Sequence, residues 1–472
     1  MRWTGWWWVP LAVAVLSVAA CSSGGSNPDD LIPVHTPPTI DNLPDGGTNV
    51  IERDGGTGGG DDGGTTGGED GGTGGDGGTD GGGGTVGPIS FPTLSGWQFF
   101  GPQHGGPREV HGVTADGAGN IWVAGGLDGL YLLTPGADEY KRFTHADGLS
   151  GHNGVGFAVI SVSGGPGGTV YVGYKGLESG GFDEADPMWM QKTGDADKVV
   201  WNGATLSVTH YDISSPPGMY AQYPQGREKV RHVFRLEYDP KTQNVWFGGN
   251  HGVGLYEHKS KTVWEHQHAH INGYKESAAK DPSGASYTML SGDWWGIGVD
   301  PDGNFWMGGG HRVARIRYAS EGGQFWASVD PVIDVWPDAQ KDDARPENRT
   351  DDLISDLMIT PSGDVWVGSI NNGLARIDGS TFAVSHISRS QLADPAVTAL
   401  ERDPRDGSVW VGHLWGGLTR IKGGQYQHLS MGELGRPLVD MVVNDIQSFN
   451  QGGTRRILVA FSGGAVGVYT GD

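Results

Sequence analysis

Polar residues that could take part in chemistry recur in this sequence at one fixed offset from a repeated aromatic residue. His251, His311 and Asn371 each follow a tryptophan by five residues, and Trp415 follows another tryptophan by the same distance. Imidazoles can bind metal ions and can exchange protons near pH 7. The regular offset predicts that these side chains come from equivalent loops of a repeated unit.

We predict that these loops form one binding site at the mouth of the fold, because ligands commonly meet loops that a rigid scaffold positions. Two interpretations of the site remain open. In the first, the histidines share a metal ion or perform acid–base catalysis. In the second, which we favour, the side chains bind a ligand or water through hydrogen bonds, with no metal, no other cofactor and no catalytic residue. The predicted ligand-binding residues are Asp128, His251, His311, Asn371, Asn372, His413 and Trp415.

The elements that must position these loops form a repeat. Residues 364–377 (DVWVGSINNGLARI) contain an apolar run with Trp366, a glycine, a small polar turn and a second apolar run. This pattern is typical of two adjacent antiparallel strands. Copies of it surround six further anchor residues: Trp122, Tyr171, Trp246, Trp306, Trp410 and Leu458. With Trp366 included, the seven anchors are separated by 49, 75, 60, 60, 44 and 48 residues along the chain.

Seven copies at these spacings predict an all-β fold, a seven-bladed β-propeller with four antiparallel strands per blade, over residues 96–472. The last copy ends after residues 465–469, three strands into its blade. Residues 96–100 (GWQFF) resemble an outer strand but have no blade of their own. We therefore expect this N-terminal strand to join the last blade, because this pairing closes the ring and removes two exposed sheet edges.

The repeated tryptophan is expected between neighbouring blades and not on a sugar-binding surface. A large ring on the second strand of each blade buries about 150 to 250 Å² of surface where two sheets meet. The glycines that follow it allow the backbones to approach closely. The turn at residues 300–304 (DPDGN) resembles the start of a calcium loop, but equivalent hairpins at residues 239–244 and 403–408 favour a simple turn.

The repeat DPxGxVWVGxxxxGLxRI resembles the two-component-regulator propeller repeats of periplasmic sensor regions, and more loosely the NHL and YVTN classes. Four of the seven copies match it best, those around Trp122, Trp306, Trp366 and Trp410. The resemblance implies a propeller that recognises a ligand. It covers no kinase or receiver segment, so it does not imply that this chain signals.

The N-terminus predicts export and lipidation. Residues 1–20 carry Arg2 before an apolar run, which is typical of a secretory signal peptide. Val18 to Cys21 (VAAC) resemble the bacterial lipobox, which implies cleavage before Cys21 and attachment of diacylglycerol to its sulfur. By analogy with lipoprotein sorting, Ser22 favours the outer membrane, and either its periplasmic face or the cell surface remains open. Cys21 is the only cysteine, so neither a disulfide nor a catalytic thiol is expected.

Residues 21–95 are predicted to be the lipidated cysteine followed by a disordered tether. Nineteen of the 30 residues in 55–84 are glycine, and the others are Asp, Glu and Thr. Such a composition cannot bury enough apolar surface to offset chain entropy. A glycine-rich coil of this length reaches on the order of 50 Å.

Charge excludes one class of partner. Residues 22–95 hold 12 acids and one base, and residues 96–472 retain a net charge of about −13. A domain with this negative charge is not expected to bind nucleic acid, and its membrane attachment must come from the lipid on Cys21.

We predict a monomeric, envelope-anchored lipoprotein that binds a glycan or a protein partner without catalysis. No nucleophile elbow, zincin, P-loop or dinucleotide motif stands in a suitable setting, which favours binding. Two alternatives remain open. One is a polysaccharide lyase or hydrolase with a His/carboxylate site at the propeller mouth, and the other is a structural subunit of an envelope complex.

Overall fold

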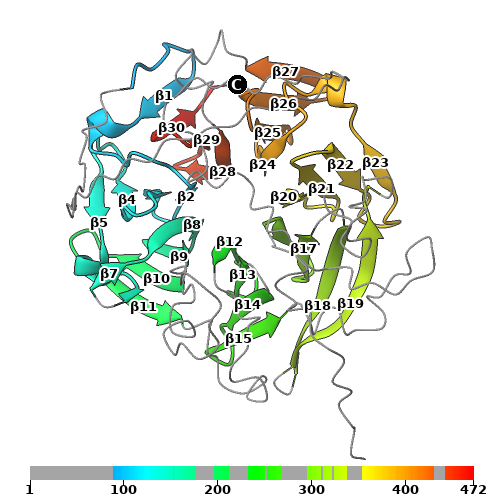
Figure 1. The fold of residues 1–472 in the computed structure, drawn as a ribbon, viewed down its shortest axis with the longest axis horizontal. Coiled ribbons are helices and arrows are strands. Elements are labelled where there is room, and N and C mark those ends of the chain that lie inside the picture. Colours follow the sequence, from blue (N-terminus) through cyan, green and yellow to red (C-terminus); the bar gives the residue numbers. More distant parts are fainter. Residues whose placement is uncertain are drawn as a thin grey trace, which may run out of the picture. The chain divides into compact units, whose positions relative to one another are not determined.

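Seven four-stranded antiparallel sheets surround a common axis in the computed structural model of this protein (Figure 1). The prediction of an all-β, seven-bladed propeller is confirmed. The predicted signal peptide, Cys21 and most of the predicted tether lie outside the described residues. No helix among the described residues has the length and apolar character needed to cross a membrane. The structure describes residues 89–152, 154–175, 196–211, 232–249, 252–267, 295–309, 312–321, 324–336, 353–429 and 442–471.

The first four blades each use four consecutive strands. Blade 1 contains β2 (Gly112–Ala115), β3 (Ile121–Ala124), β4 (Leu130–Leu133) and β5 (Lys141–Phe143). Blade 2 contains β8 (Ala158–Gly164), β9 (Thr169–Lys175), β10 (Ala196–Trp201) and β11 (Leu206–Tyr211). Blade 3 contains β12 (Val233–Tyr238), β13 (Val245–Gly249), β14 (Gly252–Glu257) and β15 (Thr262–Gln267). Blade 4 contains β16 (Ile297–Val299), β17 (Phe305–Gly309), β18 (Arg312–Glu321) and β19 (Gln324–Asp334).

The remaining blades follow the same plan until the ring closes. Blade 5 contains β20 (Ile354–Ile359), β21 (Val365–Ser369), β22 (Gly373–Ile377) and β23 (Val384–His386). Blade 6 contains β24 (Val397–Arg402), β25 (Val409–His413), β26 (Leu418–Lys422) and β27 (Gln425–Leu429). Blade 7 contains β28 (Val443–Gln451), β29 (Thr454–Phe461), β30 (Ala465–Tyr469) and the N-terminal β1 (Trp97–Phe100). The connections hold a short ribbon, β6 (Gly151–His152) with β7 (Val155–Gly156), and three 3-10 turns, η3 (Pro102–His104), η4 (His145–Asp147) and η5 (Arg389–Gln391).

Closure occurs as predicted, through pairing of β1 with β30. Trp97 lies opposite Tyr469 and Phe100 lies opposite Val466 in an antiparallel register. The rings of Trp97 and Tyr469 have centroids 5.0 Å apart. Residues 89–94 fall within the predicted tether, but they also lie against this blade. Phe91 stacks on Phe99 at 5.5 Å, and the backbone of residue 89 bonds the side chain of residue 103 in both directions.

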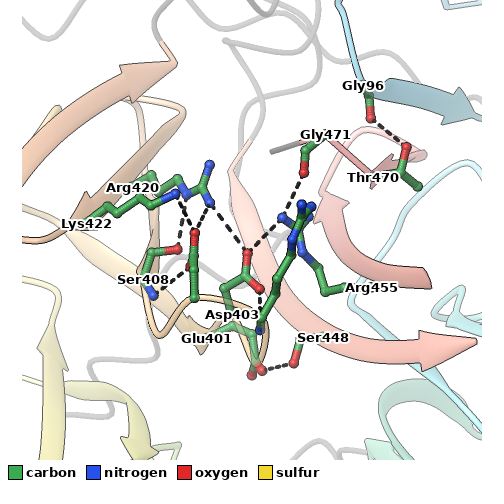
Figure 2. A network of polar contacts seen from close by, with 12 residues as sticks. Gly96, Glu401, Asp403, Ser408, Arg420, Lys422, Ser448, Arg455, Thr470 and Gly471 are labelled. Atoms are coloured by element: carbon green, nitrogen blue, oxygen red, sulfur yellow. Dashed lines mark hydrogen bonds and ion pairs between the residues drawn. The ribbon is translucent and has the colours of Figure 1, made fainter. Parts of the chain in front are cut away.

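A buried ion-pair network fastens blade 6 to the closing blade (Figure 2). The Asp403 carboxylate is fully buried, 3.1 Å from Arg455 of blade 7 and 3.6 Å from Arg420 of blade 6. Arg455 also donates a hydrogen bond of 2.8 Å to the Gly471 carbonyl. One residue earlier, the Thr470 amide donates to the Gly96 carbonyl at 2.8 Å, so the two ends of the ring meet beside this network.

An anchor on the second strand of each blade packs against the next blade, as the sequence predicts. Trp122 packs among blade 2 residues, and Trp306 and Trp410 pack in the same way among residues of blades 5 and 7. At the joint of blades 3 and 4, Trp246 stacks on Phe305 at 4.5 Å. These four tryptophans are at most 1% exposed, whereas Trp366 is only partly buried at the joint of blades 5 and 6.

In blades 1 and 4 an aspartate closes the hairpin that connects the first and second strands. Asp300 accepts hydrogen bonds from the backbone of Asp302 and Asn304 and from the Trp306 indole. Asp116 makes the equivalent bonds in blade 1, including one of 2.8 Å from the Trp122 indole. The interpretation of residues 300–304 as a turn is therefore correct.

Hydrogen bonds between neighbouring first strands complete the joints. Side chains at the starts of these strands donate to a carbonyl of the following blade at 2.6 to 2.7 Å: Ser161 to Val233, Ser355 to Val397, Thr398 to Val443 and Asn444 to Val110. In three of these strands the donor itself, Ser355, Thr398 or Asn444, is the residue that a register shift leaves out of the pairing. Such a bulge leaves one residue unpaired within its own sheet, which allows it to turn towards the next blade.

Glycine two residues after the anchor is required where the next blade presses closely on the strand. A Cβ atom at Gly412 would lie 2.5 Å from Val443 Cγ1, and one at Gly368 would lie 2.7 Å from Val397 Cγ1. Blade 7 has Ala460 at the equivalent position. The tolerance for a methyl group therefore depends on which side chain the next blade presents.

Replacement Gly412→Ala is expected to lower the free energy of unfolding by about 1 to 3 kcal/mol, because it overpacks the joint of blades 6 and 7. In the double variant Gly412→Ala/Val443→Ala the clash is removed, so its loss should be smaller than the sum of the two single losses. Denaturant unfolding of all four proteins measures this coupling. Strictly additive losses would contradict the close approach.

Candidate functional site

One rim of the propeller, which we call the variable rim, carries the turns between second and third strands and the connections between blades. Both kinds of segment reach the same end of an antiparallel blade because its strands alternate in direction. Within the described residues the variable rim comprises 101–111, 125–129, 144–152, 154–157, 369–373, 387–396, 413–417 and 462–464. It is the rim on which the sequence analysis places the ligand.

Asp128 lies on this rim, but an arginine already occupies its carboxylate. Arg108 Nε is 3.0 Å from Asp128 Oδ2 and Arg108 Nη2 is 2.8 Å from Oδ1, a two-point ion pair between the connection into blade 1 and the turn of that blade. The hydrogen bond from Arg108 holds the pKa of Asp128 below its usual value. In this structure Asp128 shapes the rim through that ion pair.

Asn371, Asn372 and Trp415 occupy the turns of blades 5 and 6. The backbone amides of both asparagines donate to the Ser369 hydroxyl, at 3.1 and 2.8 Å, which holds the turn in a tight loop. Asn371 is exposed and Asn372 is half-buried. Trp415 is 52% exposed, unlike the buried tryptophans of the anchors. Asn371 and Trp415 therefore present side chains to solvent on neighbouring turns of the same rim.

His413 corrects an expectation, because its side chain is in the interior of blade 6 and not on the surface of the rim. It is fully buried, with Nε2 2.8 Å from the Thr419 hydroxyl. Burial lowers its pKa to about 4, so the ring is neutral at pH 7. The reason is that His413 is the last residue of β25, in which every residue is buried, and its ring lies against Thr419 of the adjacent strand β26.

The other two histidines of the predicted site, His251 and His311, lie outside the described residues. Asp128, Asn371 and Trp415 lie on the same rim, in the turns of blades 1, 5 and 6. Within the part of the chain that the structure describes, no group of three or more His, Cys, Asp or Glu side chains has an arrangement that could hold a metal ion. The prediction of a common site at the mouth stays a prediction.

A cluster of Ser150, Asp197 and His210 in blade 2 contains the residue types of a hydrolytic triad without its geometry. Ser150 Oγ is 2.8 Å from Asp197 Oδ1, and His210 Nδ1 contacts both groups, at 3.0 and 2.7 Å. In a catalytic triad the imidazole stands between serine and aspartate and uses a different nitrogen for each. Here one nitrogen serves both, and Ser150 and Asp197 are buried. The cluster ties the connection from blade 1 to blade 2.

Buried and partly buried charged side chains meet around the axis of the ring, in residues that the sequence analysis does not select. Arg235 of blade 3 forms a 3.1 Å ion pair with Asp445 of blade 7, and its guanidinium is 3.9 Å from Asp356 of blade 5. These blades are not neighbours, so the contacts cross the axis. We call these three residues, together with Glu237 and Glu401, the axial cluster.

Both aspartates of the axial cluster also hold the blades together. The Asp445 carboxylate accepts the Val113 amide of blade 1 at 3.0 Å, and the Asp356 carboxylate accepts the Leu400 amide of blade 6 at 2.8 Å. Arg235 therefore joins two inter-blade contacts from the opposite side of the ring. A signal for this role is present in the sequence, since these charged residues interrupt first strands that are otherwise mostly apolar.

Burial dominates the protonation of the axial cluster. It raises the pKa of Glu237 and of Glu401 to about 8, and that of Asp356 to about 6. It also raises the pKa of Asp445. Burial disfavours the charge on Arg235, but the surrounding acids outweigh it, so the pKa of the guanidinium is raised as well. The cluster thus holds one permanent cation among four acids.

Arg235→Met is expected to lower the free energy of unfolding by about 3 kcal/mol at pH 8, since it leaves two buried carboxylates without their cation. The loss should be smaller at pH 5.5, where protonation of those carboxylates compensates. Arg108→Met, which removes an arginine whose side chain is 51% exposed, is the matched control and should cost less than about 1 kcal/mol. Denaturant unfolding at both pH values measures the difference, and equal losses for the two variants would contradict the axial role of Arg235.

Comparisons with known proteins find similarity to solved structures alone. No protein-family model and no curated protein sequence matches the chain. Similar solved structures include the WD40 β-propeller domain of Doa1 (12% identity, 80% of this chain and 98% of that chain, TM-score 0.47) and YCF48 bound to D1 peptide (12%, 81% and 100%, 0.49). They also include the extracellular domain of the hybrid two-component system BT3049 from B. thetaiotaomicron (16%, 78% of this chain and 39% of that chain, 0.45). At these identities the likeness concerns the fold.

Proposed function

We propose that this propeller is a non-catalytic binding module that takes a protein ligand on its variable rim. The observation that carries the proposal is the placement of exposed apolar side chains. Leu127 is 79% exposed, Val155 is 56% exposed and Trp415 is 52% exposed, and they are the large apolar residues that the described part of the chain leaves in solvent. All three belong to the variable rim.

Exposed apolar residues on a rim of variable loops are a feature of interaction surfaces. An apolar core with aromatic anchors inside a polar rim is the usual composition of a protein interface. Two of the three residues are aliphatic, and aliphatic side chains offer neither the flat ring nor the hydrogen bonds that a sugar requires. We therefore favour a protein ligand over a glycan.

Binding is favoured over catalysis by the state of the candidate catalytic groups. His413 is buried and neutral at pH 7, Asp128 is engaged by Arg108, and Ser150 is held in a buried cluster. Among the described residues these groups stabilise the blades and their connections. The remaining surface of the rim offers contact area.

Photo-crosslinking in the organism that makes the protein tests the proposed surface. A photoreactive residue at position 415 or 127 should capture a protein, whereas one at Gln425, in the hairpin between β26 and β27 at the other end of blade 6, should not. For the captured protein, purified and titrated, Trp415→Ala and Leu127→Ser should each weaken binding about tenfold or more without changing the unfolding midpoint. Equal capture at position 425, or binding of glycans but of no protein, would overturn the proposal.

We also propose that the propeller is held at the outer membrane by the lipid on Cys21, on the periplasmic or the cell-surface side. Metabolic labelling with a fatty acid should mark the full chain, and Cys21→Ser should abolish the label and release the protein from the membrane fraction. Stable anchoring requires more than one acyl chain, and the diacylglycerol on Cys21 supplies two. Release is therefore expected once this lipid group is lost. A labelled Cys21→Ser protein, or one that stays with the membrane, would contradict this attachment.

A further inference from the structure

The axial cluster has an imbalance of charge that the binding of a ligand at the rim does not explain. Arg235 faces Asp445 and Asp356. In its own blade, each of these three residues pairs with the second-strand residue that follows the anchor by two positions, so the three lie at the same level along the axis. Glu237 and Glu401 pair with the anchors Trp246 and Trp410 themselves. Because strand residues alternate in direction, groups two residues apart face the same way, so the two glutamates form a second level along the axis.

Among the described first strands, no lysine or arginine occupies this second level. The charges of Asp356, Asp239 and Asp445 raise the pKa of Glu237, and that of Arg235 lowers it. Arg235 is paired with Asp445 on the first level. If Glu237 ionises, it therefore adds negative charge to an interior that is already acidic.

Glu401 has the same acidic surroundings and one specific partner. The charges that act on it are those of Glu237, Asp356 and Asp445, all acidic. Its carboxyl group is bonded to the Ser448 hydroxyl of blade 7 at 2.5 Å (Figure 2). This contact joins the first strands of blades 6 and 7. The ion pair of Asp403 with Arg455 connects the same two blades.

We propose that the axial cluster is a proton-dependent clamp. When Glu237 and Glu401 are protonated, the first strands of blades 3, 5, 6 and 7 are held together around Arg235. Ionisation of the two glutamates loosens this inner ring. The like charges then repel one another across the axis, between blade 3 and blades 5, 6 and 7, none of which is its neighbour in the ring. The first strands also carry the hydrogen bonds between blades, so repulsion at the axis acts on every joint that those strands form.

The direction of the pH dependence follows from the pKa values. A glutamate has a pKa of about 4.5 in the unfolded chain and, for Glu237 and Glu401, about 8 in the folded chain. The folded state binds more protons between these values, so the stabilisation is fully present below about pH 4.5 and is lost as the pH rises towards 8. His413 acts in the opposite direction, but only between about pH 4 and 6.5. The window from pH 6.5 to 8.5 therefore reports mainly on the axial cluster.

Denaturant unfolding of the full chain across this window tests the clamp. The ratio of folded to unfolded protein should fall on the order of tenfold per glutamate between pH 6.5 and 8.5. Glu237→Gln and Glu401→Gln should each remove part of this fall, and the double variant should remove most of it, because glutamine has the shape of a protonated glutamate. Glu139→Gln, a change at an exposed glutamate, is the control and should behave as the original chain.

A spectroscopic measurement keeps the test independent of how well the variants fold. Infrared spectra of the folded protein should contain the band of protonated carboxylic acids at pH 6.5, lose it by pH 9, and lack most of it in the double glutamine variant. Amide hydrogen exchange in β12 and β24, corrected for the intrinsic effect of pH, should accelerate over the same interval. No protonated carboxyl band at pH 6.5, or a double variant whose stability depends on pH as strongly as that of the original chain, would overturn the proposal.

Discussion

The whole ring depends on one contact that is repeated at every joint, the packing of a second-strand anchor against the next blade. A blade of four strands cannot bury its two faces alone, so its stability comes from its neighbours. Trp410 fills the joint with blade 7, and Gly412, two residues later on the same face of β25, leaves room for Val443 of that blade. Where the blade has Tyr171 or Leu458 in place of tryptophan, the same position is still buried. The joint requires volume at this site more than it requires a particular side chain.

This dependence explains why the fold is readable from the sequence. Regular spacing of Trp, Gly and a second apolar run encodes strand pairs, and the surplus segment around Trp97 can be matched to the incomplete last blade by counting strands. Both inferences use local pattern and chain connectivity alone. The boundary of the domain is less well encoded, because Phe91 packs on blade 7 from a segment whose composition is that of a linker.

The functional residues are harder to predict because their roles depend on side-chain direction and on distant partners. The offset from Trp410 places Trp415 on an exposed turn, but the same proximity to the rim does not expose His413, whose strand turns it inwards. Arg235 and Asp445 are 210 residues apart in the chain and meet only because the ring is closed. An acid in a first strand looks the same in the sequence whether it faces solvent or the axis. The sequence shows only that a charged residue interrupts an otherwise apolar strand.

Closure also sets the order in which the protein can assemble. The hydrogen bond between Thr470 and Gly96 spans 374 residues, so the strand made earliest must wait unpaired until nearly all the rest has been synthesised. Contacts of such separation form late and slowly, and an unpaired edge is open to wrong partners meanwhile. Because synthesis begins at the N-terminus, β1 leaves the ribosome before the other strands and is paired after them. Because β1 has only four residues, its unpaired edge can form few hydrogen bonds with a wrong strand before the ring closes.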